Sequence, residues 1–407
     1  MSKEQAVIEI RNSAIKLLVG YLNDNEGKVN LLYNETIPLE EDILGAYITS
    51  KENVIKELSN IIHLKTNDGL KININEATIV YPSFGLNVYS STKTTNTVDP
   101  NSTICQIDID NVLSLIKKER LPNPNDKLVE ILPLKFYIDG GRTYEYPPIN
   151  EVSSSVQLSA NVYALPKNLT SSYEDCIMMN GINCSKKVIA PVGVSYYLDK
   201  QKYKYKKYIL VDFNTRITTC SLVGASKVYG SSYFELGINH LVDTIVDEFK
   251  ISEDEALKLL NLYGLDLRTT TYDPFIVETY IEGMKVKIRK EQLNTLIINF
   301  LKKWLEGLKI CISSLNPSAL SVGIISLYGE SLDFKGFKEF IKDNCEFNVD
   351  FVSPNVVGCE DSSFMNCVAA LYYSSFYKGS CNDMNFVKKV NKVSRGNEEY
   401  SEIKDEL

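Results

Sequence analysis

The chain has 407 residues, of which 44% are hydrophobic and 24% are charged, the ordinary composition of a folded globular protein. This length exceeds one ordinary domain and predicts two to four. The formal net charge of −8 at pH 7 argues against nucleic acid as the main partner, because it implies no dominant basic face. No apolar stretch is long enough to span a bilayer. The nine cysteines include no Cys-x-x-Cys pair, which predicts free thiols in a reduced cytoplasmic protein and neither a disulfide scaffold nor a metal site.

A strand–turn–strand pattern occurs in each half of the chain, at residues 6–19 and 208–223. In each copy an apolar run ends near a carboxylate, Glu9 or Asp212, and a short polar turn leads into a second apolar run. A duplicated hairpin with an acid at each bend is typical of the actin-like ATPase fold. There the two bends hold the ends of a phosphate chain and its metal.

The two bends lack the glycines that phosphate binding needs. Backbone N–H groups approach a phosphate closely only where no Cβ intervenes. Here the bends read Arg-Asn-Ser at 11–13 and Asn-Thr-Arg at 214–216. We therefore expect that the fold is kept as a scaffold while ATP binding is weakened or lost. The alternative is that one of the two arginines pairs with a phosphate by charge.

Residues 75–166 carry the mixed pattern of an α+β module between the two hairpins, after strands and a helix in residues 1–74. The module's loops are rich in Ser, Thr, Asn and Pro. Because it ends before the second hairpin, we predict an inserted subdomain. Its expected elements are a strand at 78–81, a short helix capped by Asp108 or Asp110, a long strand at 128–138 interrupted by Pro133, and an alternating strand at 156–164.

Helices dominate the pattern after the second hairpin. Apolar residues at helical spacing predict an amphipathic helix at 238–249. A second helix begins at Ser252, because Glu255 completes a capping box. A third is expected at 291–314 and carries the single tryptophan, Trp304. The remaining expected elements are a buried strand at 319–327, a turn at 329–331, a short helix around Phe337 and a last helix at 364–373.

In the order and spacing of these parts the chain resembles the FtsA family of actin-like bacterial division proteins over about residues 5–375. Glu-Ile-Arg-Asn-Ser-Ala-Ile-Lys at 9–16 lines up with the family's Asp-Ile-Gly-Ser-Ser-Lys-Ile-Lys. Residues 128–141 look like its strand ending in Ile-Asp-Gly, and residues 251–264 look like its helix ending in Tyr-Gly. The resemblance implies an α/β fold of the actin-like ATPase (ribonuclease H-like) type, duplicated, with an inserted α+β (SHS2-type) subdomain.

The resemblance also implies how the chain divides into parts. These are a first lobe at 1–74 with 167–199 and 360–379, the inserted subdomain at 75–166, a second-lobe core at 200–231 with 305–359, a helical peptide-binding subdomain at 232–304, and a linker, short amphipathic segment and acidic tail at 380–407.

ATP with Mg²⁺ is the cofactor that the resemblance implies. Several family motifs at the nucleotide are altered: the Gly after the first acid is Arg11, the Gly-Gly before the helical lobe is Leu-Gly at 236–237, and the adenosine-side Gly-Gly is Tyr-Gly at 328–329. We therefore predict a vestigial site, with no catalytic residue. The residues matched to it are Glu9, Asn12, Ser13, Lys16, Asp212, Asn214, Thr215, Gly237 and Gly329.

Two further sites follow from the resemblance. The family's helical subdomain binds the C-terminal peptide of FtsZ, and here the family's Arg and Glu on the helix from 291 become Phe300 and Lys303, beside Trp304. Aromatic residues there suit an apolar peptide anchor, or equally a buried helix face. The family's membrane-targeting helix corresponds to an amphipathic segment whose apolar face holds Phe386, Val387 and Val390, opposite Lys388 and Lys389.

A basic amphipathic segment of this kind can lie in an anionic membrane surface. One short helix binds weakly, so several copies would act together, as in a filament. The alternative is a solvated tail, or a helix that packs on its own domain. The resemblance thus implies a cytoplasmic adaptor, peripheral on the inner face of the cell membrane at the division site. It would tether FtsZ filaments, recruit division partners and turn over little or no nucleotide, with self-association left open. An active actin-like ATPase and a pilus-type actin-like adaptor are the alternatives.

Overall fold

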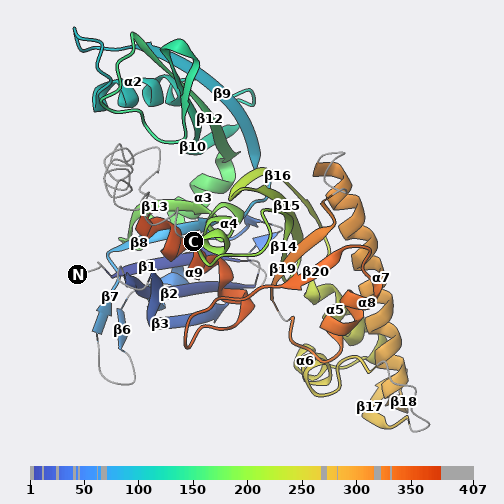
Figure 1. The fold of residues 1–407 in the computed structure, drawn as a ribbon. Helices are drawn as coiled ribbons and strands as arrows, with labels where there is room; N and C mark the ends of the chain where they lie inside the picture. The colour runs from blue at the N-terminus through green and yellow to red at the C-terminus, as the bar shows by residue number, and fades with distance from the viewer. Residues whose placement is uncertain are drawn as a thin grey trace.

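The computed structural model describes residues 4–11, 13–23, 27–39, 43–44, 46–61, 63–65, 71–266, 273–281, 283–315, 322–330 and 332–376. Figure 1 shows them as two lobes side by side, with a small subdomain above the first. Each lobe is built on a five-stranded sheet, and the subdomain on a four-stranded sheet. Within the described residues no helix is long and apolar enough to cross a membrane.

The first lobe's sheet has the strand order β13-β8-β1-β2-β3. The β1–β2 hairpin is antiparallel, and β8 lies parallel to β1 on its other side. The strands are β1 (Gln5–Ile10), β2 (Ala14–Asn23), β3 (Lys28–Pro38), β8 (Glu76–Tyr81) and β13 (Asn183–Ile189), with short pairs β4 (Ile43–Leu44) and β5 (Tyr47–Ile48), β6 (His63–Lys65) and β7 (Lys71–Asn73). The helices are α1 (Lys51–Ile61), α3 (Lys167–Met178), α4 (Ala190–Lys200) and α9 (Met365–Phe376), which follows the 3-10 turn η3 (Ser362–Phe364).

The second lobe repeats this topology in its sheet, with the order β16-β15-β14-β19-β20. Here β14 and β15 form the hairpin and β19 is the parallel neighbour of β14. The strands are β14 (Lys207–Phe213), β15 (Thr218–Gly224), β16 (Lys227–Phe234), β19 (Ile324–Gly329) and β20 (Asn348–Phe351). The helices are α5 (Ile238–Phe249), α6 (Glu253–Leu262), α7 (Lys290–Leu315) and α8 (Phe337–Asn344). The expected strand at 319–327 therefore begins later, at Ile324, and residues 319–321 lie outside the described residues.

The repeat places the two hairpin acids at equivalent positions. Glu9 lies opposite Lys16 in the first hairpin, and Asp212 lies opposite Thr219 in the second. Both acids stand on the central strand of their sheet, close to its carboxyl end. The duplicated fold predicted from the two hairpins is confirmed.

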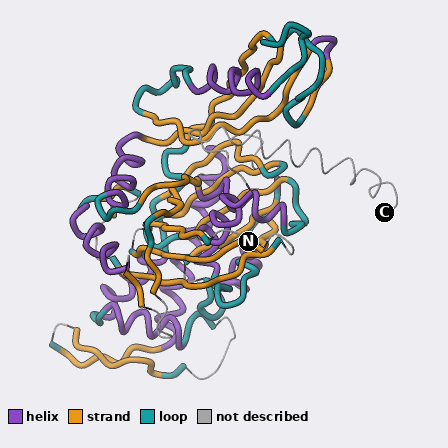
Figure 2. Tube along the Cα trace, turned by 90° about the vertical axis from the view of Figure 1, so that its left-hand side faces the viewer, coloured by secondary structure: helices purple, strands orange, loops and turns teal. Residues whose placement is uncertain are grey.

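The inserted subdomain has its own sheet and core. Its strand order is β11-β10-β12-β9, and α2 lies on one face of that sheet (Figure 2). Buried residues of α2 and of the sheet form one hydrophobic core. The elements are β9 (Asn87–Asn96), α2 (Gln106–Lys117), β10 (Asp126–Ile138), a 3-10 turn at Asp139–Gly141, β11 (Arg142–Tyr144) and β12 (Ser155–Pro166). The pairing of β10 with β12 is irregular at Pro133, as expected for a residue without an N–H group.

The insert differs from the sequence prediction in one detail and decides another. The strand predicted at 78–81 is β8, which pairs with β1 in the first lobe, so the insert starts near β9 and not at residue 75. The N-cap residue of α2 is Cys105, so Asp108 caps the helix from its first turn, as the N3 residue of a capping box, and Asp110 does not cap it. Asp108 lies inside the first turn, where its carboxylate accepts the N–H groups of Cys105 and Val98, both at 2.8 Å.

The segment predicted to be helical at 232–304 also contains a β-hairpin. Its strands, β17 (Phe275–Ile281) and β18 (Met284–Arg289), extend away from the body of the second lobe in Figure 2. The predicted capping box at the start of α6 is present: the Ser252 hydroxyl accepts the N–H of Glu255, and the Glu255 carboxylate accepts the N–H of Ser252.

Candidate functional site

The candidate site is the cleft where the two hairpins meet between the lobes. The first lobe contributes Glu9 at the end of β1, Arg11 in the bend and Lys16 on β2. The second lobe contributes Asp212 on β14, and the turn after β19 adds Glu330. Hairpins bring these residues together because an antiparallel bend projects the side chains at the end of each strand beyond the sheet.

Arg11 is the centre of this cleft. Its side chain is only 3% exposed, and its Nη2 lies 2.7 Å from Oδ1 of Asp212. Nη1 lies 3.2 Å from Oε1 of Glu9. Nε lies 3.4 Å from Oε1 of Glu330, an ion pair without a hydrogen bond. The guanidinium therefore contacts carboxylates from three separate strand ends, and two of them belong to the other lobe.

Lys16 and Asn366 complete the set of polar contacts. The buried Nζ of Lys16 donates to Oε1 of Glu330 at 2.6 Å and to the Ser363 backbone oxygen at 2.8 Å. The Asn366 amide, on α9, donates to Glu9 at 2.7 Å and to Asp212 at 3.1 Å. We call the six side chains of Glu9, Arg11, Lys16, Asp212, Glu330 and Asn366 the interlobe network.

Electrostatics keep the guanidinium charged. Burial opposes the charged form, but Asp212, Glu9 and Glu330 outweigh it and raise the pKa of Arg11 well above its ordinary value. Burial raises the pKa of Glu9, and the nearby charges of Arg11 and Lys16 oppose that rise only in part. The network thus holds a permanent positive charge at the place where the two hairpin bends meet.

The remaining space in the cleft is small. A cavity of about 20 Å³ is lined by Glu9, Arg11, Tyr173, Asp212, Asn214 and Asn366, among others, which is room for about one water molecule. Sites that hold ligands of drug size occupy roughly 300–1,000 Å³. As the described residues line it, the cleft has no room for a nucleotide's phosphates.

The second bend is packed against the start of α5. The N–H of Asn239 donates to the backbone oxygen of Thr215 at 2.8 Å, and the N–H of Ile238 donates to that of Asn214 at 3.3 Å. A Cβ at Gly237 would lie 2.3 Å from the Asn214 oxygen. N–H groups at a helix N-terminus commonly bind anions, but here the chain itself accepts from two of them. Gly237 serves this close backbone packing.

Gly329 has a comparable role at the end of β19. Its φ of 135° suits glycine, and a Cβ there would lie 2.0 Å from the backbone oxygen of Phe213. The next N–H, that of Glu330, donates to the same oxygen at 2.7 Å. The end of β19 thus lies close against the end of β14, and this places Glu330 in the cleft.

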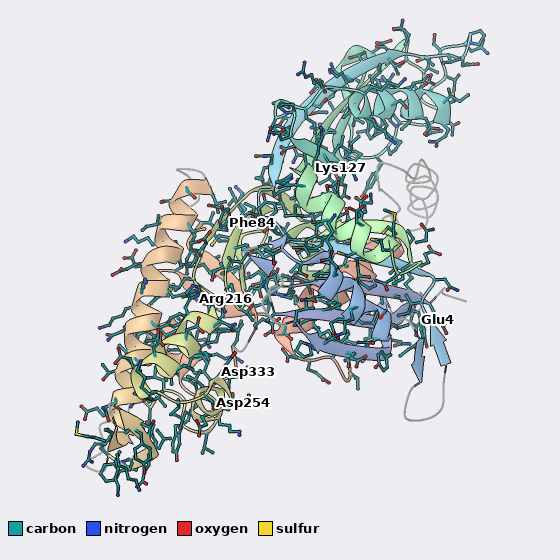
Figure 3. All side chains as sticks on the ribbon, turned by 180° about the vertical axis from the view of Figure 1, so that it is seen from behind. Glu4, Phe84, Lys127, Arg216, Asp254 and Asp333 are labelled. Atoms are coloured by element: carbon teal, nitrogen blue, oxygen red, sulfur yellow. The ribbon has the colours of Figure 1, made fainter. Side chains whose placement is uncertain are left out.

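The other residues matched to the nucleotide site lie as follows. The Ser13 backbone oxygen accepts the N–H of Leu39 at 2.7 Å, and Asn12 lies outside the described residues. Arg216, labelled in Figure 3, is partly exposed and pairs with Asp243 of α5 at 2.9 Å. Unlike Arg11, it makes its ion pair outside the interlobe network.

The predicted aromatic surface on α7 is corrected by the structure. Phe300 is 7% exposed and Trp304 is 0% exposed, both within the core of the second lobe. The Trp304 indole N–H donates to Oγ1 of Thr218 at 3.0 Å. Lys303 is exposed. The two aromatic residues form a buried helix face and not a surface for a partner. The predicted membrane residues Phe386, Val387, Lys388, Lys389 and Val390 lie outside the described residues.

Sequence reasoning missed three members of the network. Arg11 was recognised as a lost glycine but not as an ion-pair centre, although an arginine two residues after a hairpin acid was a usable signal. Glu330 follows Gly329 in the adenosine-side turn, which also could have directed attention to it. Asn366 carries no local signal, because its acceptors Glu9 and Asp212 lie 357 and 154 residues away along the chain.

Two lobes of the same topology, with the acids of both hairpins facing one cleft, define a protein with the actin-like ATPase fold. More particularly, the chain is similar to the cell division protein FtsA of Bacillus subtilis (strain 168): the two are 18% identical over 369 residues, across 90% of this chain and 82% of FtsA. No family profile matches the sequence.

Solved structures support the same fold. A chain of the PilM–PilN type IV pilus biogenesis complex superimposes with a TM-score of 0.61 at 13% identity, across 92% of this chain and 99% of that one. MreB5 of Spiroplasma citri bound to ADP superimposes with a TM-score of 0.53 at 10% identity, across 91% and 96%. The MreB5 structure shows that a relative of this fold binds a nucleotide. In the present chain, the cleft between the lobes holds the side chain of Arg11.

Proposed function

We propose that the protein is a division adaptor of the FtsA kind, which tethers FtsZ filaments to the inner face of the cytoplasmic membrane and recruits division partners. The observation that carries this proposal is the sequence similarity to FtsA, which extends over 90% of the chain and therefore across both lobes and the insert. Self-association into filaments belongs to the same proposal, because FtsA-like and MreB-like proteins share this fold.

Nucleotide turnover has no place in this proposal. Hydrolysis of a γ-phosphate needs a phosphate site, a metal and a positioned water. The interlobe network fills the corresponding cleft, and no group of His, Cys, Asp and Glu side chains in the described part of the chain is arranged to hold a metal ion. The protein would act by binding and not by catalysis.

Membrane attachment would come from the end of the chain. The described chain leaves the first lobe at the end of α9 (Met365–Phe376), and the amphipathic segment around 384–393 follows within a few residues. Its lysines would contact anionic headgroups while its apolar residues enter the interface. Several anchored copies on one FtsZ filament would give the combined affinity that one short segment lacks.

The test uses the full chain and the FtsZ of the same organism. Fluorescence anisotropy with a labelled C-terminal FtsZ peptide measures partner binding. Co-sedimentation with anionic vesicles measures membrane binding, and a chain ending before Asp383 serves as the control. We expect saturable peptide binding by both proteins, and sedimentation of the full chain only. Absence of peptide binding would contradict the adaptor role, and equal sedimentation of both proteins would contradict the anchor.

A pilus-type adaptor is the second candidate. It is favoured by the structural match to the PilM–PilN complex, which covers 99% of the chain matched there. The two candidates share a scaffold and differ in the partner peptide. An anisotropy titration with a cytoplasmic peptide from a PilN-type protein of the same organism, run beside the FtsZ peptide, separates them. The peptide with the lower Kd identifies the system.

A further inference from the structure

We infer that the side chain of Arg11 replaces a metal–nucleotide complex as the charged group that joins the two lobes of this protein. The inference deepens the nucleotide part of the proposed function and does not depend on which partner the protein recruits. It rests on which lobe supplies each contact, on the balance of charge in the cleft, and on the space that remains there.

Four polar contacts of the interlobe network pass from one lobe to the other. Arg11 pairs with Asp212 at 2.7 Å and with Glu330 at 3.4 Å. Lys16 pairs with Glu330 at 2.6 Å, and Asn366 donates to Asp212 at 3.1 Å. Every donor belongs to the first lobe and every acceptor to the second. The contacts of Arg11 with Asp212 and of Lys16 with Glu330 are charge-assisted hydrogen bonds, which are the strong ones in proteins. The chain therefore carries its own connection across the cleft.

The charge balance in the cleft excludes both parts of a magnesium nucleotide. Glu9, Asp212 and Glu330 meet the positive charges of Arg11 and Lys16. Mg²⁺ takes oxygen ligands, and the carboxylates that could supply them already contact a guanidinium whose charge would repel the ion. A phosphate would have to displace three carboxylates from Arg11, or lie against them. Like charges at such distances are strongly unfavourable in a buried site.

The small space around the interlobe network also excludes a magnesium nucleotide. The cavity of about 20 Å³ beside Arg11 takes about one water molecule. The bend at 214–216 packs on the start of α5, where Gly237 leaves no gap between helix and bend. The residues present therefore do not fit the magnesium nucleotide that the family resemblance implies. Arg11 is the residue responsible for this poor fit, because it stands where the FtsA family has glycine.

The lobes also meet away from the network, which lets Arg11 be replaced without separating them. The ring of Phe84, which follows β8, lies 4.1 Å from the ring of Tyr233 on β16. Figure 3 labels Phe84 at this contact. A variant of Arg11 thus loses one connection between the lobes and keeps another.

The experiment compares the wild-type chain with Arg11→Gly, which returns the family's glycine, and Arg216→Gly, a matched change in the other bend. The midpoint of thermal unfolding is measured in buffer, with MgCl₂ alone, and with millimolar ATP or ADP plus MgCl₂. A ligand that binds only the folded state must raise that midpoint. We expect no ligand-dependent shift for the wild type or Arg216→Gly. We expect Arg11→Gly to unfold at a lower temperature in buffer and to gain a shift with MgCl₂ or the magnesium nucleotide.

A wild-type shift with the magnesium nucleotide that Arg11→Gly abolishes would overturn the inference, because Arg11 would then bind phosphate. If Arg11→Gly fails to fold, small-angle X-ray scattering of the wild type decides. An unchanged radius of gyration with and without the magnesium nucleotide supports closure by Arg11, and a smaller radius with it contradicts that closure. These readouts involve no partner, so a failure to bind the FtsZ peptide leaves them unaffected.

Discussion

The hydroxyl of Tyr163 donates to the backbone oxygen of Val228 at 2.9 Å and accepts the backbone N–H of the same residue at 3.2 Å. Tyr163 stands near the end of β12 in the insert, and Val228 stands on β16 of the second lobe. The insert is also joined to the first lobe, where Lys127 pairs with Glu174 of α3 at 2.8 Å; Figure 3 labels Lys127 at that junction. The subdomain is therefore fixed to both lobes.

The Tyr163→Phe variant tests the contact with Val228. It removes only the hydroxyl and leaves a buried N–H and C=O without that partner, so we expect a loss of about 1–3 kcal/mol in the free energy of unfolding. Urea denaturation measures it. The control is Tyr146→Phe. Tyr146 is 52% exposed, so we expect the loss of its hydroxyl to change the free energy of unfolding little. Equal stability of the two variants would contradict the role given to Tyr163.

Glu130 predicts a pH dependence of stability. Burial raises the pKa of its carboxyl to about 8, opposed by the hydrogen bond from the Tyr373 hydroxyl, and its Oε2 is buried without a hydrogen-bond partner. Because the pKa is raised on folding, the stability that it contributes is complete below its ordinary value of 4.5. This stability is lost as the pH rises towards 8.

The Glu130→Gln variant should remove this dependence, since an amide stays neutral. We expect the free energy of unfolding of the wild type to fall between pH 5 and pH 8, and that of the variant to fall less. The two curves should therefore converge at the acidic end and separate at the alkaline end. Glu145→Gln, at an exposed position, is the control. Parallel curves for wild type and Glu130→Gln would refute the assignment.

Trp304 is a core residue, so a variant at this position would lose peptide binding through loss of stability and not through loss of a contact. Trp304→Ala would empty a fully buried site and remove the N–H that Oγ1 of Thr218 accepts, at a cost of about 3–5 kcal/mol. Lys303→Ala should change stability by less than about 0.5 kcal/mol. Chemical denaturation of both variants gives these values. If α7 does carry the peptide surface, Lys303→Ala weakens peptide binding at unchanged stability. A Trp304→Ala variant of wild-type stability would show that the ring is not a core residue.

Gly237 and Gly230 differ in whether there is space for a side chain at their position. A Cβ at Gly237 would meet backbone atoms of the 214–216 bend, while a Cβ at Gly230 on β16 would meet no atom within 4 Å. We expect Gly237→Ala to lower the free energy of unfolding by about 1–3 kcal/mol, and Gly230→Ala to leave it nearly unchanged. Thermal unfolding of the pair checks this. Equal midpoints would mean that the bend moves away without penalty.

The fold could be predicted because its signals are local and occur twice. An apolar run, an acid, a polar turn and a second apolar run specify a hairpin within about fifteen residues, and the copies at Glu9 and Asp212 imply the duplicated sheet. The β17–β18 hairpin was missed, although Glu-Gly at 282–283 stands between two alternating segments. The expectation of helices in that region outweighed this turn signal.

The site could be predicted only in part, because its partners are distant along the chain. Asn366 donates to Glu9 across 357 residues, and no local pattern connects them. The sequence did show that Arg11 replaces a glycine, but not that its guanidinium finds acids in the other lobe. Trp304 shows a similar limit: its spacing on α7 fits an exposed stripe or a buried one, and only the packing against β15 decides.

The guanidinium of Arg11 is part of the polypeptide, so, unlike a bound nucleotide, it is neither hydrolysed nor exchanged. In an actin-like protein that hydrolyses its nucleotide, the age of a subunit is recorded in the cleft as the change from triphosphate to diphosphate. If Arg11 takes the place of the nucleotide, as we infer above, there is no spent form, and old and new subunits are chemically identical. The lifetime of an assembly of such subunits would then be set by how fast each copy dissociates, and it would not depend on the supply of nucleotide.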